Sequence, residues 1–196
     1  MTATAIASTP GRLTYEQYVE ELCAQPPTRQ PYDIIDGVLN MSPAPDVTHQ
    51  RTVTRLVFLL VGLESISAAR VFTSPLDVVI RREPLRTRQP DVLVISEQRC
   101  TADGGIDMHG PLTVAPELVI EVLSPSETRR TVYAKIADHQ EVGVVECWIV
   151  SPQAETIELL SLSPDSVRTA AVYGQGDEVQ SLMFPAIKLP NAGVFA

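Results

Sequence analysis

Leu118-Val119-Ile120-Glu121-Val122-Leu123-Ser124-Pro125 is the stretch of sequence that decides the fold. Its first six residues form an almost unbroken apolar run of strand length, which predicts a strand buried on both faces within a helix-covered sheet. Alternation of side chains places Glu117, Val119, Glu121 and Leu123 on one face of that strand. Glu121 is therefore a carboxylate inside a predicted core, which costs free energy unless the group is paired or binds a metal ion.

A helix is predicted directly after this strand. Ser124 can cap it, Pro125 suits its first position and Glu127 completes a capping box. We expect the helix to run to about Val142 and to end at Gly143. Further on, we predict strands over Val144–Val150, Glu155–Leu160 and Val167–Tyr173, the last two antiparallel, and an irregular tail over Leu182–Phe195 with a final strand turn.

The residues before the strand predict a mixture of helices and strands. Apolar residues at helical spacing mark two helices, and Asp36-Gly37 between two short apolar runs predicts a hairpin with a tight turn. The predicted elements are a helix over Thr14–Cys23, hairpin strands over Tyr32–Ile35 and Val38–Met41, a long helix over Val47–Ser67, strands near Arg70–Thr73, Leu76–Ile80 and Asp91–Ile95, and a loop over Ser96–Ala115. This order predicts an α/β fold of the mixed α+β type, with a mixed central sheet flanked by helices and an N-terminal helix and hairpin.

Length and composition limit the class of protein. The chain has 196 residues, of which 44% are hydrophobic and 20% charged, as in an ordinary globular protein. We predict a flexible N-terminus over residues 1–12 and a single domain over residues 13–196.

The compartment is inferred from the N-terminus and the cysteines. No apolar run has the length of a membrane span, and Met1–Thr9 lacks the basic start and apolar centre of a secretory signal. Cys23, Cys100 and Cys147 are odd in number and lack metal-ligand spacing, which indicates free thiols in a reducing compartment. We therefore expect a cytoplasmic protein that does not enter a membrane.

The charge distribution is uneven. A net charge of -9 argues against a broad basic surface for duplex nucleic acid, although a bound divalent cation would offset part of the local negative charge. Between Val79 and Pro90, four arginines stand against one glutamate: Arg81, Arg82, Arg86 and Arg88. These arginines either belong to a solvated loop, the interpretation we favour, or contact phosphate groups beside an active site.

Asp91 and Lys135 are the natural companions of Glu121. Asp91 begins a predicted strand after Pro90, and if the two strands are neighbours both carboxylates can converge on a Mg²⁺ ion. Lys135 is one of only two lysines in the chain, against 13 arginines. Val132, Lys135 and His139 recur at helical spacing, so Lys135 lies at the edge of the face that packs on the sheet and its ammonium can reach the carboxylates.

Each of these residues also has a purely structural interpretation. Asp91 can cap a turn after Pro90, and Glu121 can form a buried ion pair with Lys135 or an arginine. Lys135 can extend its ammonium from the helix edge to water. Together, however, the three structural interpretations need three separate explanations, whereas one site explains all three residues.

The residues resemble those of the PD-(D/E)XK nuclease superfamily and, more closely, of the bacterial restriction-endonuclease-like family called Uma-two. The segments that carry the resemblance are Tyr32–Gly37, Met41–Pro43, His49-Gln50, Gln89–Val92, Pro116–Ser126, Lys135, Gly143-Val144 and Trp148–Val150. The resemblance implies that Asp91 and Glu121 bind Mg²⁺ or Mn²⁺, with the Val122 carbonyl as a further ligand. Because Leu123 occupies the superfamily's usual lysine position, it also implies that Lys135 supplies the ammonium.

The resemblance extends to supporting residues and has departures. Asp33 stands where the family usually has a glutamate, and His49 matches a family histidine at the start of the long helix. Thr131 stands where the family often has an aspartate, and His139 and Cys147 each replace a tyrosine. For His139, we favour a partly buried, hydrogen-bonded histidine over a metal ligand.

Three hypotheses about function follow. The first is a metal-dependent endonuclease that hydrolyses phosphodiester bonds of nucleic acid, with DNA as the expected substrate. Its catalytic residues would be Asp91, Glu121 and Lys135. The second is a catalytically silent nuclease fold that serves as a binding or regulatory module. The third is an unrelated small-molecule metalloenzyme that uses His49 and Asp33. For a small domain that must grip two strands, we also expect a homodimer.

Overall fold

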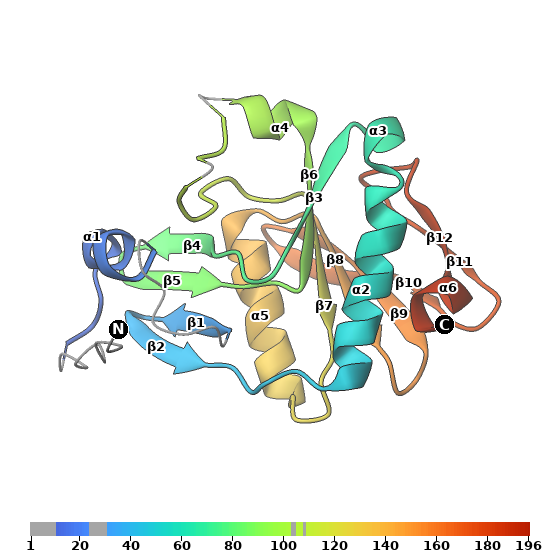
Figure 1. Ribbon diagram of the computed structural model, residues 1–196, viewed down its shortest axis with the longest axis horizontal. Coiled ribbons are helices and arrows are strands. Elements are labelled where there is room, and N and C mark those ends of the chain that lie inside the picture. Colours follow the sequence, from blue (N-terminus) through green and yellow to red (C-terminus); the bar gives the residue numbers. More distant parts are fainter. Residues whose placement is uncertain (1–10, 24–30, 103–104, 108) are drawn as a thin grey trace, which may run out of the picture.

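The computed structural model describes residues 11–23, 31–102, 105–107 and 109–196 of the chain. Most of the predicted flexible N-terminus therefore lies outside the described residues, as do the side chain of Cys23 and part of the predicted loop over Ser96–Ala115. The helices and strands form a mixed α+β architecture in which helices cover a central sheet (Figure 1).

The central sheet has six strands in the order β10-β9-β8-β7-β6-β3. Its strands are β3 (Ala69–Thr73), β6 (Val92–Ser96), β7 (Leu118–Val122), β8 (Glu146–Ser151), β9 (Thr156–Ser163) and β10 (Ser166–Tyr173). β7 and β8 are parallel and the other neighbours are antiparallel, which confirms the predicted mixed sheet. All five residues of β7 are buried, as the apolar run predicts.

Two helices cover the central sheet, one on each face. α2 (Val47–Val61) packs through Leu56 and Leu60 on the face that carries Ile120. α5 (Arg129–Val142) packs through Ile136 on the opposite face, which carries Val119. The predicted alternation along β7 is therefore confirmed, and it places Glu121 on the face covered by α5.

A second sheet of four strands contains the predicted hairpin. Its order is β2-β1-β5-β4, with β1 (Tyr32–Ile35), β2 (Val38–Met41), β4 (Val78–Arg82) and β5 (Leu85–Arg88). The turn residues Asp36 and Gly37 both have positive φ, 52° and 79°, as a tight turn between two antiparallel strands requires. We call these four strands the hairpin sheet.

The remaining elements are short. The N-terminal helix consists of α1 (Tyr15–Gln17), capped by Thr14, and a π-helical continuation η1 (Tyr18–Cys23). The others are α3 (Glu64–Ser67), α4 (Glu97–Thr101), the two-stranded sheet of β11 (Glu178–Gln180) and β12 (Lys188–Pro190), and α6 (Asn191–Phe195). The tail is therefore more ordered than the sequence indicates, and the predicted loop after β6 begins with a short helix.

Two predicted helix boundaries are wrong. The long helix ends at Val61, because Gly62 is a poor helix former and Leu63 leaves the helical path before α3 begins. The helix after β7 begins at Arg129, where Thr128 and Thr131 form a capping box, and it ends at Gly143 as predicted. Ser124 and Glu127 do make the predicted contact, but in a turn that precedes the helix.

Candidate functional site

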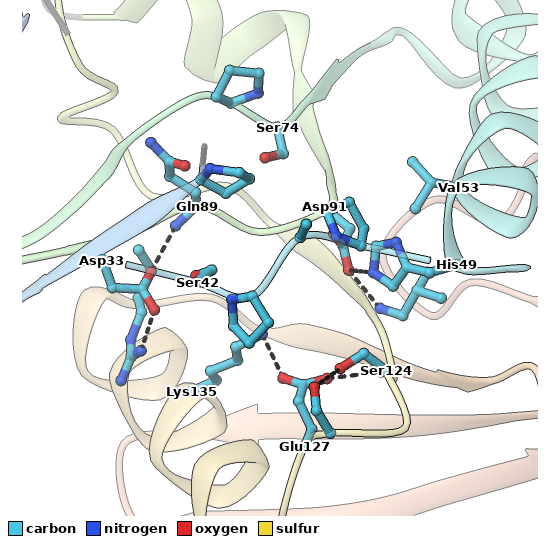
Figure 2. A pocket seen from close by; sticks show the side chains of 18 of the residues that line it. Asp33, Ser42, His49, Val53, Ser74, Gln89, Asp91, Ser124, Glu127 and Lys135 are labelled. Carbon is cyan, nitrogen blue, oxygen red and sulfur yellow. Dashed lines mark hydrogen bonds and ion pairs between the residues drawn. The ribbon is translucent and has the colours of Figure 1, made fainter. Parts of the chain in front are cut away.

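A cleft of about 880 Å³ opens between the hairpin sheet, α2, the carboxyl end of β7 and the first half of α5 (Figure 2). Its lining includes most of the predicted site residues: Asp33, His49, Arg88, Asp91, Val122 and Lys135. Five of these residues come from five different elements and Asp91 lies directly before β6, so the fold itself assembles the site. Glu121 lies below the surface of the cleft and is 4% exposed.

Asp91 lies directly before β6, and the pairing of Val92 with Ile120 brings it beside the end of β7. Its Oδ2 accepts hydrogen bonds from the Val122 N–H at 2.8 Å and from the His49 imidazole at 3.2 Å. Its Oδ1 has no hydrogen-bond partner among the described residues. Burial raises the pKa of Asp91, the charge of Glu121 adds to this, and the His49 hydrogen bond opposes it.

Glu121 is held by two side chains of α5. The Lys135 ammonium donates to Oε2 at 2.9 Å, and His139 Nε2 lies 2.7 Å from Oε1. Burial alone would raise the pKa of Glu121, but the Lys135 charge and the His139 hydrogen bond lower it to about 2. Glu121 is therefore ionised at neutral pH, one of two carboxylates that meet where β6 and β7 pair.

Lys135 bridges two carboxylates. Its ammonium lies 2.9 Å from Glu121 and 2.9 Å from Glu127, a residue of the turn between β7 and α5. Burial works against the charge of Lys135, but the two carboxylates outweigh it and raise its pKa well above the ordinary value. A charged ammonium therefore stands at the surface of the cleft, as the helical spacing predicts.

His49 and Asp33 support the site from opposite walls. Burial alone would lower the pKa of His49, but the hydrogen bond and charge of Asp91 raise it above the ordinary value. Asp33 is bound to the Arg88 guanidinium at 2.7 Å and accepts the Gln89 N–H at 3.3 Å. Burial raises the pKa of Asp33 even though Arg88 opposes it.

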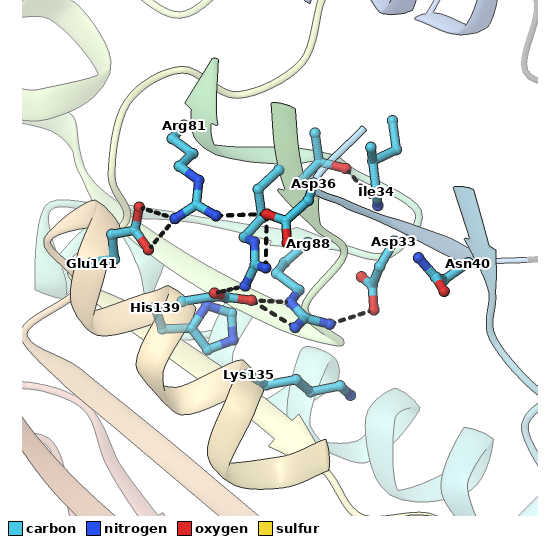
Figure 3. Close-up of polar contacts among 12 residues, drawn as sticks. Asp33, Ile34, Asp36, Asn40, Arg81, Arg88, Lys135, His139 and Glu141 are labelled. Atoms are coloured by element: carbon cyan, nitrogen blue, oxygen red, sulfur yellow. Dashed lines mark hydrogen bonds and ion pairs between the residues drawn. The ribbon is translucent and has the colours of Figure 1, made fainter. Parts of the chain in front are cut away.

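The four arginines lie on β4 and β5, so the prediction of a solvated loop is wrong. Three of them form a chain of ion pairs that joins the hairpin sheet to α5 (Figure 3). Arg81 binds Asp36 and Glu141, Arg86 binds Asp36 and Asp138, and Arg88 binds Asp138 and Asp33. Arg82 lies 4.4 Å from the ring centroid of Tyr15 instead.

Sequence patterns did not identify two acidic residues, Asp138 and Glu127, as part of the site. Asp138 is 2% exposed and receives both Arg86 and Arg88, and its position one helical turn beyond Lys135 was a usable signal. Glu127 was predicted as a capping residue, but its carboxylate also binds Lys135. His139 is fully buried and bound to Glu121, which agrees with the expected hydrogen-bonded histidine.

The donor set at this cleft fits a hard divalent cation. Mg²⁺ is commonly held by one or two carboxylates, with water and phosphate oxygens as its remaining ligands. Oδ1 of Asp91 has no partner among the described residues, and the pKa of Asp91 is raised first by burial and then by the charge of Glu121, which a cation would offset. Among the described residues, no group of three or more His, Cys, Asp or Glu side chains is arranged to hold a metal ion.

Comparison with known proteins identifies the family of the chain. Residues 15–192 match the model of the Uma2 family, whose description is "Putative restriction endonuclease". The chain belongs to the Uma2 family. The family resemblance inferred from Tyr32–Gly37, Pro116–Ser126 and the other segments is thus confirmed, and membership indicates nuclease activity. A search of curated proteins finds no match.

A solved structure supports the fold. The chain is similar to the crystal structure of a "putative nuclease belonging to DUF820" from Anabaena variabilis ATCC 29413, with a TM-score of 0.68 and 20% sequence identity. The match covers 86% of this chain and 91% of that one. It confirms the predicted restriction-endonuclease-like core for this Uma2 chain.

Two other expectations can be compared with the structure. The third hypothesis predicts a metal ion near the hairpin and away from Glu121; His49 and Asp33, the residues that it uses, line the same cleft as Asp91 and Lys135. In the described part of the chain, no helix is long and apolar enough to cross a membrane.

Proposed function

We propose that this Uma2 chain is an endonuclease that uses Mg²⁺ or Mn²⁺ to hydrolyse phosphodiester bonds of DNA. The observation that carries the proposal is the meeting of Asp91 and Glu121 at adjacent strands, with the Lys135 ammonium beside them at the surface of the cleft. Two carboxylates and an ammonium are the groups that metal-assisted hydrolysis of a phosphodiester needs.

The metal ion would be held by Asp91, Glu121 and the Val122 carbonyl. When bound, such an ion lowers the pKa of a coordinated water and offsets negative charge that develops on the phosphate. Lys135 donates to a phosphate oxygen or to the attacking water. His49 orients Asp91, and His139 orients Glu121, each through the hydrogen bond that it makes now.

Cleavage assays test the proposal. The purified protein should cleave plasmid DNA with Mg²⁺ or Mn²⁺ and leave it intact with a chelator, and Asp91→Ala should abolish cleavage. An anomalous-scattering map from a Mn²⁺-soaked crystal should show the ion between Asp91 and Glu121. Intact DNA and RNA under all these conditions, together with no metal binding by calorimetry, would sink the idea.

A silent nuclease fold is the second candidate. The observation that favours it is that both oxygens of Glu121 already have partners within the chain, Lys135 and His139. Such a module would bind nucleic acid or a partner without cutting, and its metal affinity would not depend on Asp91. Loss of metal binding in Asp91→Ala would exclude it.

We also propose that residues 13–196 form a single domain that acts in the cytoplasm as a homodimer, so that two clefts meet the two strands of a duplex. Light scattering coupled to size-exclusion chromatography should give twice the mass of 21.4 kDa. A monomer that cleaves both strands would contradict the dimer.

A further inference from the structure

Both carboxylate oxygens of Glu127 have a partner, and one of these partners is the Lys135 ammonium. Glu127 lies in the turn between β7 and α5, its side chain is 19% exposed and it lines the cleft. Oε1 receives the Lys135 ammonium at 2.9 Å, and Oε2 accepts the Ser124 backbone N–H at 3.0 Å (Figure 2). A carboxylate fixed by its own backbone in this way is a rigid anchor for whatever it binds.

Lys135 needs such an anchor. An ammonium on a four-carbon stem has many rotamers, so one contact alone leaves its position poorly defined. Two of its three N–H donors go to Glu121 and Glu127, at 2.9 Å each. The third has no acceptor among the described residues, and the side chain lines the cleft. Two anchors therefore leave one donor for a phosphate oxygen or a water.

The neighbouring residues of α5 do not offer Lys135 a second carboxylate. Thr131, one helical turn before it, directs its hydroxyl to the Thr128 carbonyl within the capping box. Asp138, nearly one turn after it, is bound to Arg86 and Arg88. Within the described part of the chain, Glu127 is thus the carboxylate that shares Lys135 with Glu121.

We propose that Glu127 is a positioning residue for Lys135 in the hydrolysis proposed above, on which this inference rests. Because Glu127 and Glu121 share the ammonium, a change at Glu121 leaves the other contact in place. Glu127 then keeps Lys135 within the cleft while Glu121 takes up another ligand. Glu127 itself acts through Lys135 and needs no contact with the substrate.

A lysine-specific NMR experiment tests the contact without metal or substrate. The chain has two lysines, so protein labelled with ¹⁵N and ¹³C lysine gives one ammonium signal for Lys135 and one for the exposed Lys188. Glu127→Gln should shift the Lys135 signal and speed its hydrogen exchange while Lys188 stays unchanged. Glu97→Gln removes a carboxylate from an exposed ion pair with Arg70 and should change neither. An unchanged Lys135 signal in Glu127→Gln would overturn the proposal.

Kinetics test the consequence. Glu127→Gln should lower kcat for DNA cleavage by about tenfold to a hundredfold, the value of a hydrogen bond to a charged group, with KM changed less than about twofold. In a Lys135→Met background the same substitution should cause no further loss. Glu127→Asp, which keeps the charge but shortens the reach, should resemble Glu127→Gln and is the second variant if Glu127→Gln does not fold.

The outcomes separate this inference from the proposed function. If the wild-type chain cleaves nothing, the proposed function fails while the Lys135 signal still decides the contact. If the wild type cleaves and Glu127→Gln cleaves equally well, only the role of Glu127 fails. A loss of Mn²⁺ affinity in Glu127→Gln as large as the loss in Asp91→Ala would make Glu127 a metal ligand and would overturn the positioning role.

Discussion

Glu121 and Glu146 are two buried glutamates on neighbouring parallel strands, yet their surroundings differ. Glu121 is 4% exposed, and its partners are the Lys135 ammonium and the His139 imidazole. Glu146 is fully buried, and its partners are neutral donors from Trp148 and from the chain after β11. These donors are the Trp148 indole at 2.6 Å, the Ser181 hydroxyl at 2.9 Å, and the N–H groups of Leu182 at 3.0 Å and Met183 at 2.8 Å.

The difference teaches that burial of a carboxylate does not by itself mark a functional site. Both glutamates meet the rule that a buried polar group needs partners. The hydrogen bonds to Glu146 attach the chain after β11 to the central sheet, so Glu146 has a structural role. Glu121 instead lies beside a second carboxylate, Asp91, and under a lysine that lines a cleft. The kind of partner and the nearness of open space decide which glutamate can do chemistry.

Replacing the carboxylates of the cleft should have the largest effect. Glu121→Gln and Asp91→Ala should each reduce DNA cleavage by about a thousandfold or more, because the metal ion is worth several kcal/mol of transition-state stabilisation. Plasmid cleavage, with circular dichroism as the folding control, measures this. Residual activity within about tenfold of wild type in both variants would mean that the carboxylates of the cleft are not needed for cleavage. Glu121 would then not differ from Glu146 in function.

Glu146→Gln should show the opposite behaviour. It keeps the shape of the side chain but removes the charge and misplaces an amide against four donors, so unfolding free energy should fall by about 2–4 kcal/mol. Cleavage per folded molecule should stay at the wild-type level. Urea denaturation and an activity assay well below the unfolding temperature give the two readings. If activity fell while stability did not, Glu146 would belong to the functional site.

The stability contribution of Glu121 should depend on pH in a defined window. Its pKa in the folded chain is lowered to about 2 from 4.5, so the stability that it contributes is fully present above about pH 4.5 and is lost as pH falls towards 2. The difference in Tm between wild type and Glu121→Gln should therefore be constant from pH 7 to about 5 and should shrink below that. Calorimetry from pH 7 to 2.5 checks this. A difference that grows on acidification would mean that the folded-state pKa is raised.

The sequence predicts the central part of this arrangement well, for a physical reason. The apolar run around Glu121 determines both faces of β7, and the Asp36-Gly37 turn determines the hairpin. Lys135 follows from helical spacing, because one helix packed on one strand limits where its side chains can lie. All of these inferences depend on contacts that are local or that join neighbouring elements.

The parts that the sequence did not predict depend on distant segments. β5 was missed because Leu85–Arg88 has charged residues that become buried only through Asp33 and Asp138. The structural role of Glu146 depends on hydrogen bonds from Ser181 and its neighbours, which lie over thirty residues later in the chain. Glu127 satisfied a local motif, so its contact with Lys135 was hidden by a correct but incomplete interpretation. Roles of this kind need the three-dimensional arrangement.

The arginine chain gives the smallest expected effect and extends the comparison beyond the two glutamates. Arg86 is 17% exposed, and its two terminal nitrogens bind Asp138 and Asp36, while its buried Nε has no hydrogen-bond partner among the described residues. Arg86→Gln should lower unfolding free energy by about 1–2 kcal/mol, because Asp138 keeps Arg88 as a partner. The salt dependence of DNA binding should not change, since an arginine held by two carboxylates releases no counterions from DNA.

Fluorescence anisotropy across a salt series, in an Asp91→Ala background, measures the slope of the logarithm of the binding constant against the logarithm of salt concentration. The exposed Arg168→Gln is the control. A slope smaller by about one would show that Arg86 contacts a phosphate, and would move this arginine from the structural side of the comparison to the functional one.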